Sequence, residues 1–334
     1  MQTSGWNNRM NKKIIVVGDN HIHHKTPENR TGDYLTDTTN KLLDCLELGK
    51  LHKVDAVIFL GDLFDKYEVS TKAVCMTMNI LKGQANGDPW PFKKFITIGN
   101  HDINNNYPLD KCSLGILIES EVLTKVDHDE ELSISFAHYV NDLDKEIVEG
   151  LLAKSSALIW SCHASIGSQK DRFEEYIVPF SDVPVHENNI MIFSGHIHHP
   201  MSVTRDDGKR FINPGAIGRY SASKDNLERT LKVFLFEYDL DGNIYNEEYL
   251  DLPSFRNGDD AFKKEEILAK KELKEQTKEF IANIQSIKTN NWANTNIVDK
   301  IAFLKESAVK NNLEERVIEV ALEAVKEANI GVSK

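Results

Sequence analysis

Five short apolar runs, each ending in residues that can bind a metal or transfer a proton, constrain this chain more than any other feature. The runs are IIVVGDNH, AVIFLGD, FITIGNHD, ALIWSCHA and IMIFSGHIH, at residues 14–21, 56–62, 95–102, 157–164 and 190–198. Each is typical of a buried strand with a polar end. Amphipathic stretches with helical spacing separate the first three runs. The alternation predicts an α/β layered fold whose strand ends converge on one crevice.

The composition narrows the class of protein. A chain of 334 residues is long enough for one large domain with an accessory region, or for two domains. With 40% apolar residues, 28% charged residues and no run of about 20 apolar residues, it is typical of a soluble protein without a membrane span. The polar, basic first residues lack an apolar stretch, so we expect neither a secretory signal nor an anchor. Four cysteines without paired spacing favour reduced thiols and a cytoplasmic location.

The net charge of −12 argues against a surface that is basic throughout, as a protein that coats nucleic acid would need. Nucleic acid stays open as a substrate, because bound metals and local basic patches can supply a positive field. One such stretch contains Arg205, Lys209, Arg210, Lys224 and Arg229. A cluster of this kind is also typical of an ordinary solvated face.

The pattern beyond residue 200 differs from the pattern before it. Asp-Gly pairs at 207–208 and 241–242 lie between segments of alternating polarity, such as LKVFLFEY. Such pairs are strong signals of β-hairpins. We therefore expect hairpins here, and a second sheet packed on the first.

Three regions follow from these changes of pattern. Residues 1–12 are predicted to be a flexible leader, and residues 13–255 the catalytic domain. From Asp259 onward the chain is highly charged and helical in pattern. Residues 256–334 are therefore predicted to form a helical C-terminal region, either a separate unit or an arm that binds a partner.

The polar ends of the five runs form a set of candidate metal ligands. In chain order they are Gly18-Asp19-Asn20-His21, Gly61-Asp62-Leu63-Phe64-Asp65, Gly99-Asn100-His101-Asp102, the strand-end His163 and Gly195-His196-Ile197-His198. Two hard or borderline divalent cations held close together need mixed oxygen and imidazole ligands, with one carboxylate between them to offset their repulsion. One such motif alone would carry little weight. Five in this order, each after an apolar run, predict a centre with two metals.

These five blocks resemble the calcineurin-like metallophosphoesterase superfamily, from about Lys13 to Arg219. The resemblance implies an α/β sandwich of two sheets flanked by helices in four layers, followed here by the helical C-terminal arm. It also implies two divalent metal ions, which we expect to be manganese. It assigns one ion to Asp19, His21 and His198, the other to Asn100, His163 and His196, and the bridge to Asp62. Two carboxylates against two divalent cations leave about two positive charges, which suits hydroxide and an anionic phosphodiester.

His101 follows a proposed ligand but is not needed as one. The resemblance assigns it to the transition state, where it would stabilise charge or protonate the leaving oxygen. Asp102 is then its expected orienting partner. Asp65 is expected to support a metal ligand by hydrogen bonding rather than to touch a metal.

The choice of phosphoester depends on details of the same motifs. Serine/threonine phosphatases of the superfamily have GDxVDRG and GNHE, whereas this chain has GDLFD and GNHD. Together with GHIHHP and INPGAIGRY, these resemble the SbcD-type DNA repair nucleases, which include phage recombination endonuclease subunits. The implied activity is exonuclease and endonuclease cleavage of DNA, in a bacterial cell or, for a phage-encoded chain, in the infected host. Cyclic-nucleotide phosphodiesterases share most of these blocks, so a stand-alone enzyme for cyclic or small nucleotides stays open as the alternative.

Residues 210–220 return the chain toward the expected site and end in Arg219 and Tyr220. An arginine can bind phosphate and a tyrosine can stack on a base, which makes this pair candidate substrate-binding residues. A rim arginine and a packing tyrosine would give the same pattern.

The charged C-terminal region carries a narrow apolar stripe that needs a partner. Its members are Ile297, Ile301, Leu304, Val317, Val320 and Leu322. SbcD-type nucleases dock such helices on the coiled coil of an SMC-like ATPase, so the resemblance implies an SbcC-like partner, and it also implies a homodimer. The alternative is a helical hairpin that folds onto its own catalytic domain.

Overall fold

A computed structural model of the chain describes residues 11–83, 88–104, 108–168 and 177–286, with the single residues 302, 305, 306 and 319. The chain divides into two compact units, Met1–Phe262 and Lys263–Lys334. The first strand begins at Asn11, so it includes the last two residues of the stretch expected to be a leader. The apolar stripe expected in the C-terminal region lies outside the described residues.

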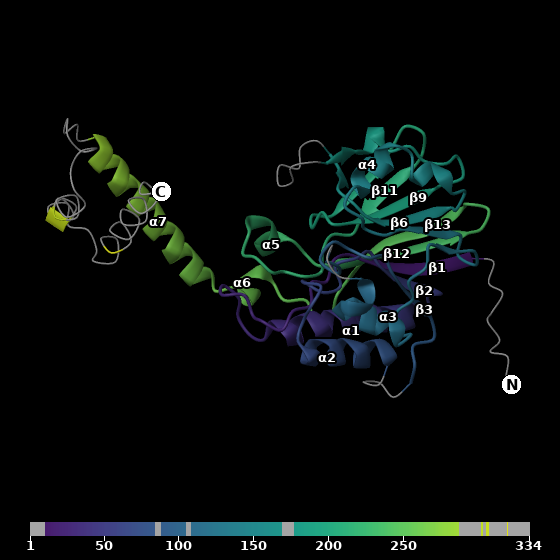
Figure 1. Ribbon diagram of the computed structural model, residues 1–334, viewed down its shortest axis with the longest axis horizontal. Helices are drawn as coiled ribbons and strands as arrows, with labels where there is room; N and C mark the ends of the chain where they lie inside the picture. Colours follow the sequence, from purple (N-terminus) through teal and green to yellow (C-terminus); the bar gives the residue numbers. More distant parts are fainter. Residues whose placement is uncertain are drawn as a thin grey trace. The chain divides into compact units, whose positions relative to one another are not determined.

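The first unit contains two large sheets (Figure 1). The first sheet has the order β13-β12-β1-β2-β3, formed by β1 (Asn11–Val17), β2 (Ala56–Phe59), β3 (Lys93–Ile96), β12 (Lys232–Asp239) and β13 (Ile244–Asp251). The second has the order β10-β11-β9-β6-β5-β4, formed by β4 (His128–Asp129), β5 (Ile134–Ala137), β6 (Ile159–His163), β9 (Met191–Gly195), β10 (Met201–Thr204) and β11 (Arg210–Asn213). A small parallel pair consists of β7 (Ile166–Gly167) and β8 (Val178–Pro179).

Helices cover the outer faces of the two sheets (Figure 1). In the first unit they are α1 (Tyr34–His52), α2 (Thr71–Lys82), α3 (Ser113–Glu119), α4 (Leu143–Val148), α5 (Lys224–Glu228) and α6 (Gly258–Ala261), with the 3-10 turns η1 (Leu109–Lys111), η2 (Leu152–Lys154) and η3 (Phe180–Asp182). The short α5 and α6 lie away from the faces of the sheets. In the second unit, α7 spans Lys264–Ser286. Helix α1 begins after Asp33, whose side chain accepts from the N–H of Leu35, and ends at Lys53 in the left-handed conformation. Among the helices that the structure describes, none is both long and apolar enough to cross a membrane.

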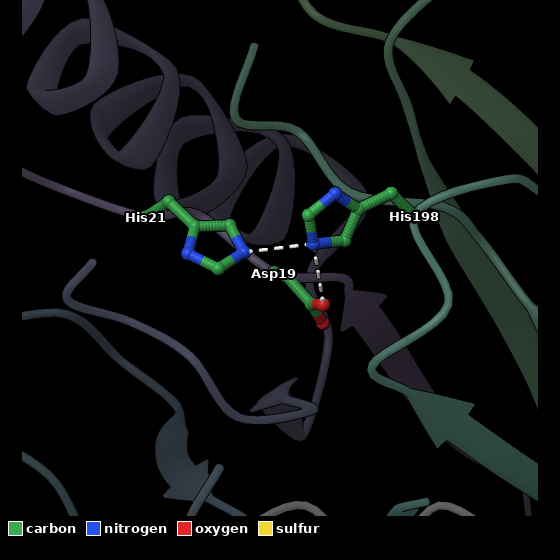
Figure 2. A group of neighbouring side chains, drawn as sticks. All are labelled: Asp19, His21 and His198. Atoms are coloured by element: carbon green, nitrogen blue, oxygen red, sulfur yellow. Dashed lines mark hydrogen bonds and ion pairs between the residues drawn. The ribbon is translucent and has the colours of Figure 1, made fainter. Parts of the chain in front are cut away.

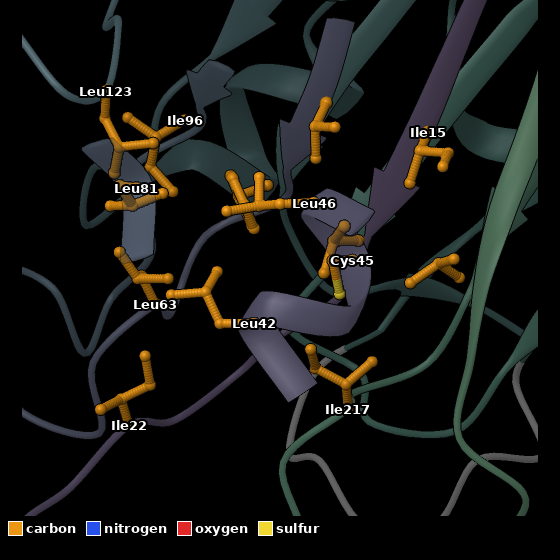
Figure 3. Packing of buried hydrophobic residues seen from close by; sticks show 14 of the residues in the cluster. Ile15, Ile22, Leu42, Cys45, Leu46, Leu63, Leu81, Ile96, Leu123 and Ile217 are labelled. Atoms are coloured by element: carbon orange, nitrogen blue, oxygen red, sulfur yellow. The ribbon is translucent and has the colours of Figure 1, made fainter. Parts of the chain in front are cut away.

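Strand β1 shows how alternation builds the layers. Ile15 and Val17 face the helical side and pack in one cluster with Leu42 of α1 (Figure 3). Ile14 and Val16 point the other way and pack with aromatic residues of β9 and β12 between the two sheets. A third cluster joins α4 to the outer face of the second sheet. The predicted fold class, two sheets flanked by helices, is confirmed.

Both predicted hairpins are present, but they do not form the second sheet by themselves. Strands β10 and β11 pair around the turn at 207–208 and join the sheet that contains β6 and β9. Strands β12 and β13 pair around the turn at 241–242, and β12 then lies antiparallel to β1 in the first sheet. This placement buries the phenylalanines of β12 between the sheets.

Candidate metal centre

Strand ends from both sheets bring the predicted ligands to one place. In the first sheet, the chain beyond β1 carries Asp19, the chain beyond β2 carries Asp62 and the chain beyond β3 carries Asn100. In the second sheet, His163 is the last residue of β6, and His196 directly follows β9. Because parallel strands deliver their carboxyl ends to one edge, the polar loops meet there.

Three of the site residues adopt a left-handed backbone conformation that residues with a side chain rarely take. The φ angles are 51° at His21, 48° at Asp62 and 81° at His196. Such conformations cost about 1–3 kcal/mol each and cluster at functional sites. Gly99 permits the close approach of the loops, because a Cβ there would clash with the Asp62 carboxylate.

Asp19, His21 and His198 form a first group, which we call the exposed cluster (Figure 2). The Nε2 atoms of His21 and His198 lie 2.9 Å apart. The Nε2 atom of His198 also lies 3.6 Å from Oδ2 of Asp19. The His198 side chain is 47% exposed and the Asp19 side chain 2% exposed, so the group opens toward solvent through His198.

Asp62, His163 and His196 form a second group, which together with Asn100 we call the buried cluster. The amide oxygen of Asn100 lies 2.9 Å from Nε2 of His163 and 3.0 Å from Nδ1 of His196. Oδ2 of Asp62 lies 3.4 Å from Nε2 of His163, whose side chain is fully buried. Nδ1 of His163 donates to the backbone carbonyl of Leu60 at 2.8 Å, which directs Nε2 into the cluster.

The electrostatics of the site favour positive charge beside Asp62. Burial would raise the pKa of Asp62, but His163, His21 and His101 lower it below its usual range. Burial would likewise lower the pKa of His163, yet the Asp62 carboxylate raises it to about 10. By contrast, partial desolvation of the His198 ring, with His21 and Arg229 nearby, lowers its pKa to about 4.

The donor set fits two divalent cations. Asp62 lies in the buried cluster, and its Oδ2 is also 3.8 Å from Nε2 of His21 in the exposed cluster. Imidazole nitrogens with carboxylate and amide oxygens are the ligands that borderline divalent cations accept. In the exposed cluster the Nε2 atoms of His21 and His198 face each other, as expected of two ligands for one ion. The exposed cluster would hold one cation and Asn100, His163 and His196 the other, with Asp62 shared between them.

His101 lies beside both clusters. Its ring is 4.9 Å from the His21 ring, centroid to centroid and edge-on. Its backbone N–H donates to Oδ1 of Asp62 at 2.9 Å, and its Nδ1 donates to the backbone carbonyl of Asp65 at 2.6 Å. The Nε2 atom is therefore the ring atom that is left to act on a substrate.

The contact predicted between Asp102 and the His101 ring is corrected. Burial raises the pKa of Asp102 to about 7. Its two carboxylate oxygens accept the backbone N–H groups of Gly99 at 3.0 Å and Phe64 at 3.2 Å. Asp102 thus ties the loop after β3 to the loop after β2, and the Asp65 carbonyl orients the His101 ring.

A pocket of about 560 Å³ opens beside the two clusters. It is lined by His21, Asp65, Lys66, Tyr67, Asn100, His101, Ile103, His198, Gly218, Tyr220, Ser221 and Asn226. The carboxylate of Asp65 lies 3.5 Å from Nδ1 of His21, where a side chain that supports a ligand is expected. Reactive side chains and room for a substrate thus occur together.

Arg219 and Tyr220, neighbours in the sequence, occupy opposite environments. Tyr220 is 41% exposed and lines the pocket. Arg219 is 1% exposed, donates to the backbone carbonyls of Arg229 and Arg256, and lies over the Phe255 ring at 4.9 Å. The prediction that Arg219 binds substrate is therefore corrected, because its guanidinium is committed to buried contacts.

The basic stretch noted in the sequence is largely engaged within the protein. Arg205 pairs with Asp207 at 2.6 Å, and Arg210 pairs with Glu247. Arg229 is buried. These contacts reduce the positive charge that the stretch offers to a polyanion.

Sequence reasoning did not single out five pocket residues, among them Ile103 directly after GNHD, and it treated Arg229 only as part of a basic stretch. Lys66 and Tyr67 directly follow the GDLFD motif, and Ser221 directly follows INPGAIGRY, so proximity to a motif was the available signal. Asn226 and Arg229 lie farther along the chain and carried no comparable signal.

Comparison with known proteins identifies the family. No curated protein sequence matches this chain. Among solved structures, a dimetal phosphatase from Danio rerio is 9% identical over 72% of this chain and 99% of its own, with a TM-score of 0.39. A Staphylococcus aureus protein described as a 5′-nucleotidase, solved with alpha-ketoglutarate, is 14% identical over 72% of this chain, with a TM-score of 0.41. This chain spans about half of that protein, 54% of its length.

The model of the calcineurin-like phosphoesterases matches residues 12–245, which is more than half of the chain. Members of this family hydrolyse phosphoesters with two divalent metal ions, and the two clusters supply candidate ligands for them. The chain therefore belongs to the calcineurin-like phosphoesterase family.

Proposed function

We propose that the protein is a manganese-dependent phosphodiesterase that cleaves DNA as an exonuclease and endonuclease, together with an SbcC-like ATPase of the SMC type. The observation that carries the phosphodiesterase part is the position of Asp62. Its Oδ2 lies 3.4 Å from His163 in one cluster and 3.8 Å from His21 in the other. A carboxylate shared by two cations leaves surplus positive charge for an anionic diester.

The chain's own residues would orient the substrate and move the proton. When bound, two divalent cations would supply Lewis acidity to the phosphoryl group and lower the pKa of water. His101 is held through Nδ1 by the Asp65 carbonyl, so Nε2 can donate a proton to the leaving oxygen or stabilise its charge. Tyr220 lines the same pocket and offers an aromatic face to a base.

Two features support DNA as the substrate. The motifs GDLFD, GNHD, GHIHHP and INPGAIGRY resemble those of SbcD-type nucleases. The chain also continues beyond the catalytic unit into a second compact unit, Lys263–Lys334. An enzyme for small nucleotides needs only the pocket, whereas a nuclease subunit that works with an ATPase needs a region that binds it.

The alternative is a stand-alone phosphodiesterase for cyclic or small nucleotides. The pocket of about 560 Å³ is large enough for a nucleotide. Arg205 and Arg210 are also paired with acidic side chains, so two positive charges are less available to bind DNA phosphates. Both observations favour this second reading over a surface that tracks a long duplex.

One assay separates the two readings. The purified chain with Mn²⁺ is given end-labelled duplex DNA, cyclic AMP and bis-p-nitrophenyl phosphate, with Asp62→Asn as the matched inactive control. Shortening of the labelled DNA by the wild type alone would support the nuclease. Turnover of cyclic AMP with intact DNA would support the alternative, and no hydrolysis of any diester would remove the phosphodiesterase proposal.

The ATPase partner is tested by deleting residues 290–334. If this region binds the ATPase, metal binding and cleavage of the small diester should stay near wild type, because every proposed ligand precedes Pro200. ATP-stimulated digestion of duplex DNA should vanish. If the region instead folds onto the catalytic unit, the deletion should lower the melting temperature and impair cleavage of the small diester as well. A loss of stability with unaltered ATPase binding would exclude a docking arm.

We further propose a homodimer in the cytoplasm of a bacterium or of a phage-infected host. Light scattering should then give twice the chain mass of 37.9 kDa. A monomer at the concentrations used for catalysis would exclude the dimer.

A further inference from the structure

Among the residues of the two clusters, His198 is the most exposed. Its side chain is 47% exposed, whereas those of His21 and His163 are 4% and 0% exposed. His198 also lies beyond the end of β9, in a stretch without helix or strand. Packing therefore contributes little to the position of this ring, and the backbone of His198 must be fixed by other contacts.

Arg229 makes these contacts. It is 7% exposed, and its Nη1 donates to the backbone carbonyl of His198 at 2.7 Å and to that of Ala216. Its Nη2 donates to the carbonyl of Gly218 at 3.0 Å and to Oδ1 of Asn226 at 2.7 Å. The His198 carbonyl also accepts the N–H of Ala216 at 3.0 Å. One guanidinium thus joins the His198 loop to residues 216–218.

Residues 216–218 are in turn bonded to the other side of the exposed cluster. The N–H groups of Ile217 and Gly218 donate to the backbone carbonyl of Asp19 at 2.9 and 3.0 Å. Gly218 permits this approach, because a Cβ there would lie 2.5 Å from the carbonyl oxygen of Asn20. The backbones of Asp19 and His198 are therefore connected through one segment, and Arg229 donates to His198 and to two carbonyls of that segment.

We propose that Arg229 is a positioning residue that sets the distance of the His198 ring from Asp19 and His21. The inference rests on the proposed dinuclear centre. Arg229 acts through backbone carbonyls and not on the cation, so its loss should weaken the ion of the exposed cluster. The ion of the buried cluster should be affected less, since His163 is the last residue of β6 and His196 directly follows β9, so the sheet itself places them.

The test is a calorimetric titration of the metal-free full chain with Mn²⁺. The variants are Arg229→Gln and Arg229→Lys. The matched control is Arg205→Gln, because Arg205 also donates to two backbone carbonyls, those of Phe180 and Val183 in and beside η3. We expect Arg229→Gln to weaken one of two ions by about 10- to 100-fold, as loss of a supporting contact does. Arg229→Lys should weaken the same ion less, and the control should bind both ions normally.

A double-mutant cycle with His198→Ala identifies the route of the effect. If Arg229 acts through His198, adding Arg229→Gln to His198→Ala should cost no further affinity. Equal weakening of both ions, unchanged binding of both, or full additivity in the cycle would overturn the proposal. If Arg229→Gln fails to fold by circular dichroism, the lysine variant decides, since two unchanged affinities there would refute the positioning role. A wild-type chain that binds fewer than two ions would instead refute the dinuclear centre.

Discussion

The two clusters use the same residue types, yet they are held in different ways. In the buried cluster, His163 ends strand β6, His196 follows β9, and the Asn100 amide contacts both rings. In the exposed cluster, His198 comes from a loop and is half-exposed. Sheet geometry thus places the first set, whereas hydrogen bonds to the backbone place the last member of the second.

The pKa values of His163 and His198 are also shifted in opposite directions from that of a free histidine. Burial lowers both values, but the Asp62 carboxylate, 3.4 Å from His163, outweighs burial and raises that pKa to about 10. At His198, partial desolvation of the half-exposed ring, together with the positive charges of His21 and Arg229, outweighs the Asp19 carboxylate at 3.6 Å and lowers the pKa to about 4. A shared residue type therefore does not give a shared electrostatic role, because the number and sign of the neighbours decide it.

The difference between the two clusters should disappear when the carboxylate of Asp62, which both share, is neutralised, because both ions are then affected. Asp62→Asn should weaken both cations, since Oδ2 of Asp62 faces His163 and His21. We expect diester hydrolysis to fall by about 1000-fold or more, as removal of a central charge does. Metal content and circular dichroism should show a folded protein with few bound ions. Two tightly bound ions and near-normal turnover would show that Asp62 is not the bridge.

Removal of the His101 ring, which lies beside both clusters but is not a proposed ligand, should have the next largest effect. His101→Ala should retain both cations but slow diester cleavage by about 100- to 10000-fold, the range for general acid catalysis. The loss should shrink on a substrate with a nitrophenolate leaving group if Nε2 protonates the leaving oxygen. Equal losses on both substrates would indicate charge stabilisation instead. Normal cleavage of DNA would exclude His101 from the reaction.

Paired alanine variants sharpen the comparison itself. His198→Ala should weaken the binding of one ion and leave the melting temperature of the metal-free protein almost unchanged, because its ring is half-exposed. His163→Ala should remove one ion and also lower the melting temperature, because it opens a fully buried site and leaves Asp62 without its closest positive neighbour. Thermal unfolding without metal measures both. Equal losses of stability would show that the His198 and His163 side chains contribute equally to the stability of the metal-free protein.

Much of the fold could be predicted from the sequence because local pattern decides it. The runs at 14–21, 56–62, 95–102, 157–164 and 190–198 each overlap a strand, with the site residues at or just beyond the strand ends. The place of β12 beside β1 could not be predicted, since a hairpin has the same turn signal in either sheet. That choice depends on the long-range pairing of β1 with β12, in register from Asn11 with Asp239 to Val16 with Phe234.

The site was predictable in its members and less so in its contacts. Motif order was enough to bring Asp19, Asp62 and His163 together, because each lies at or just beyond the end of a strand. Adjacent residues, however, direct their side chains differently. Tyr220 faces the pocket while Arg219 is buried, and the His101 ring contacts a carbonyl 36 residues away rather than the next side chain. Sequence adjacency carries no information about such directions.

The smallest effect concerns a histidine that supports the buried cluster from outside. Nδ1 of His138 accepts the N–H of Ile98 at 3.1 Å, in the loop that carries Asn100, and Nε2 donates to the carbonyl of Val126 at 3.1 Å. Only the neutral ring can do both, because a proton on Nδ1 would face the N–H of Ile98. Burial, with Lys125 nearby, lowers the pKa of His138 from 6.5 to about 4.

The sign of the resulting pH dependence follows from this shift. The unfolded ring takes up a proton below pH 6.5 and the folded ring only near pH 4, so the unfolded state binds more protons in between. The contribution of His138 to stability is therefore complete above pH 6.5 and is lost as the pH falls toward 4, with about 2 kcal/mol lost by pH 5. Urea unfolding of the metal-free protein at pH 7 and pH 5 should show a loss that His138→Gln reduces. Because all other titrating groups are common to both proteins, identical pH dependence in the two would show that His138 is already charged in the folded state.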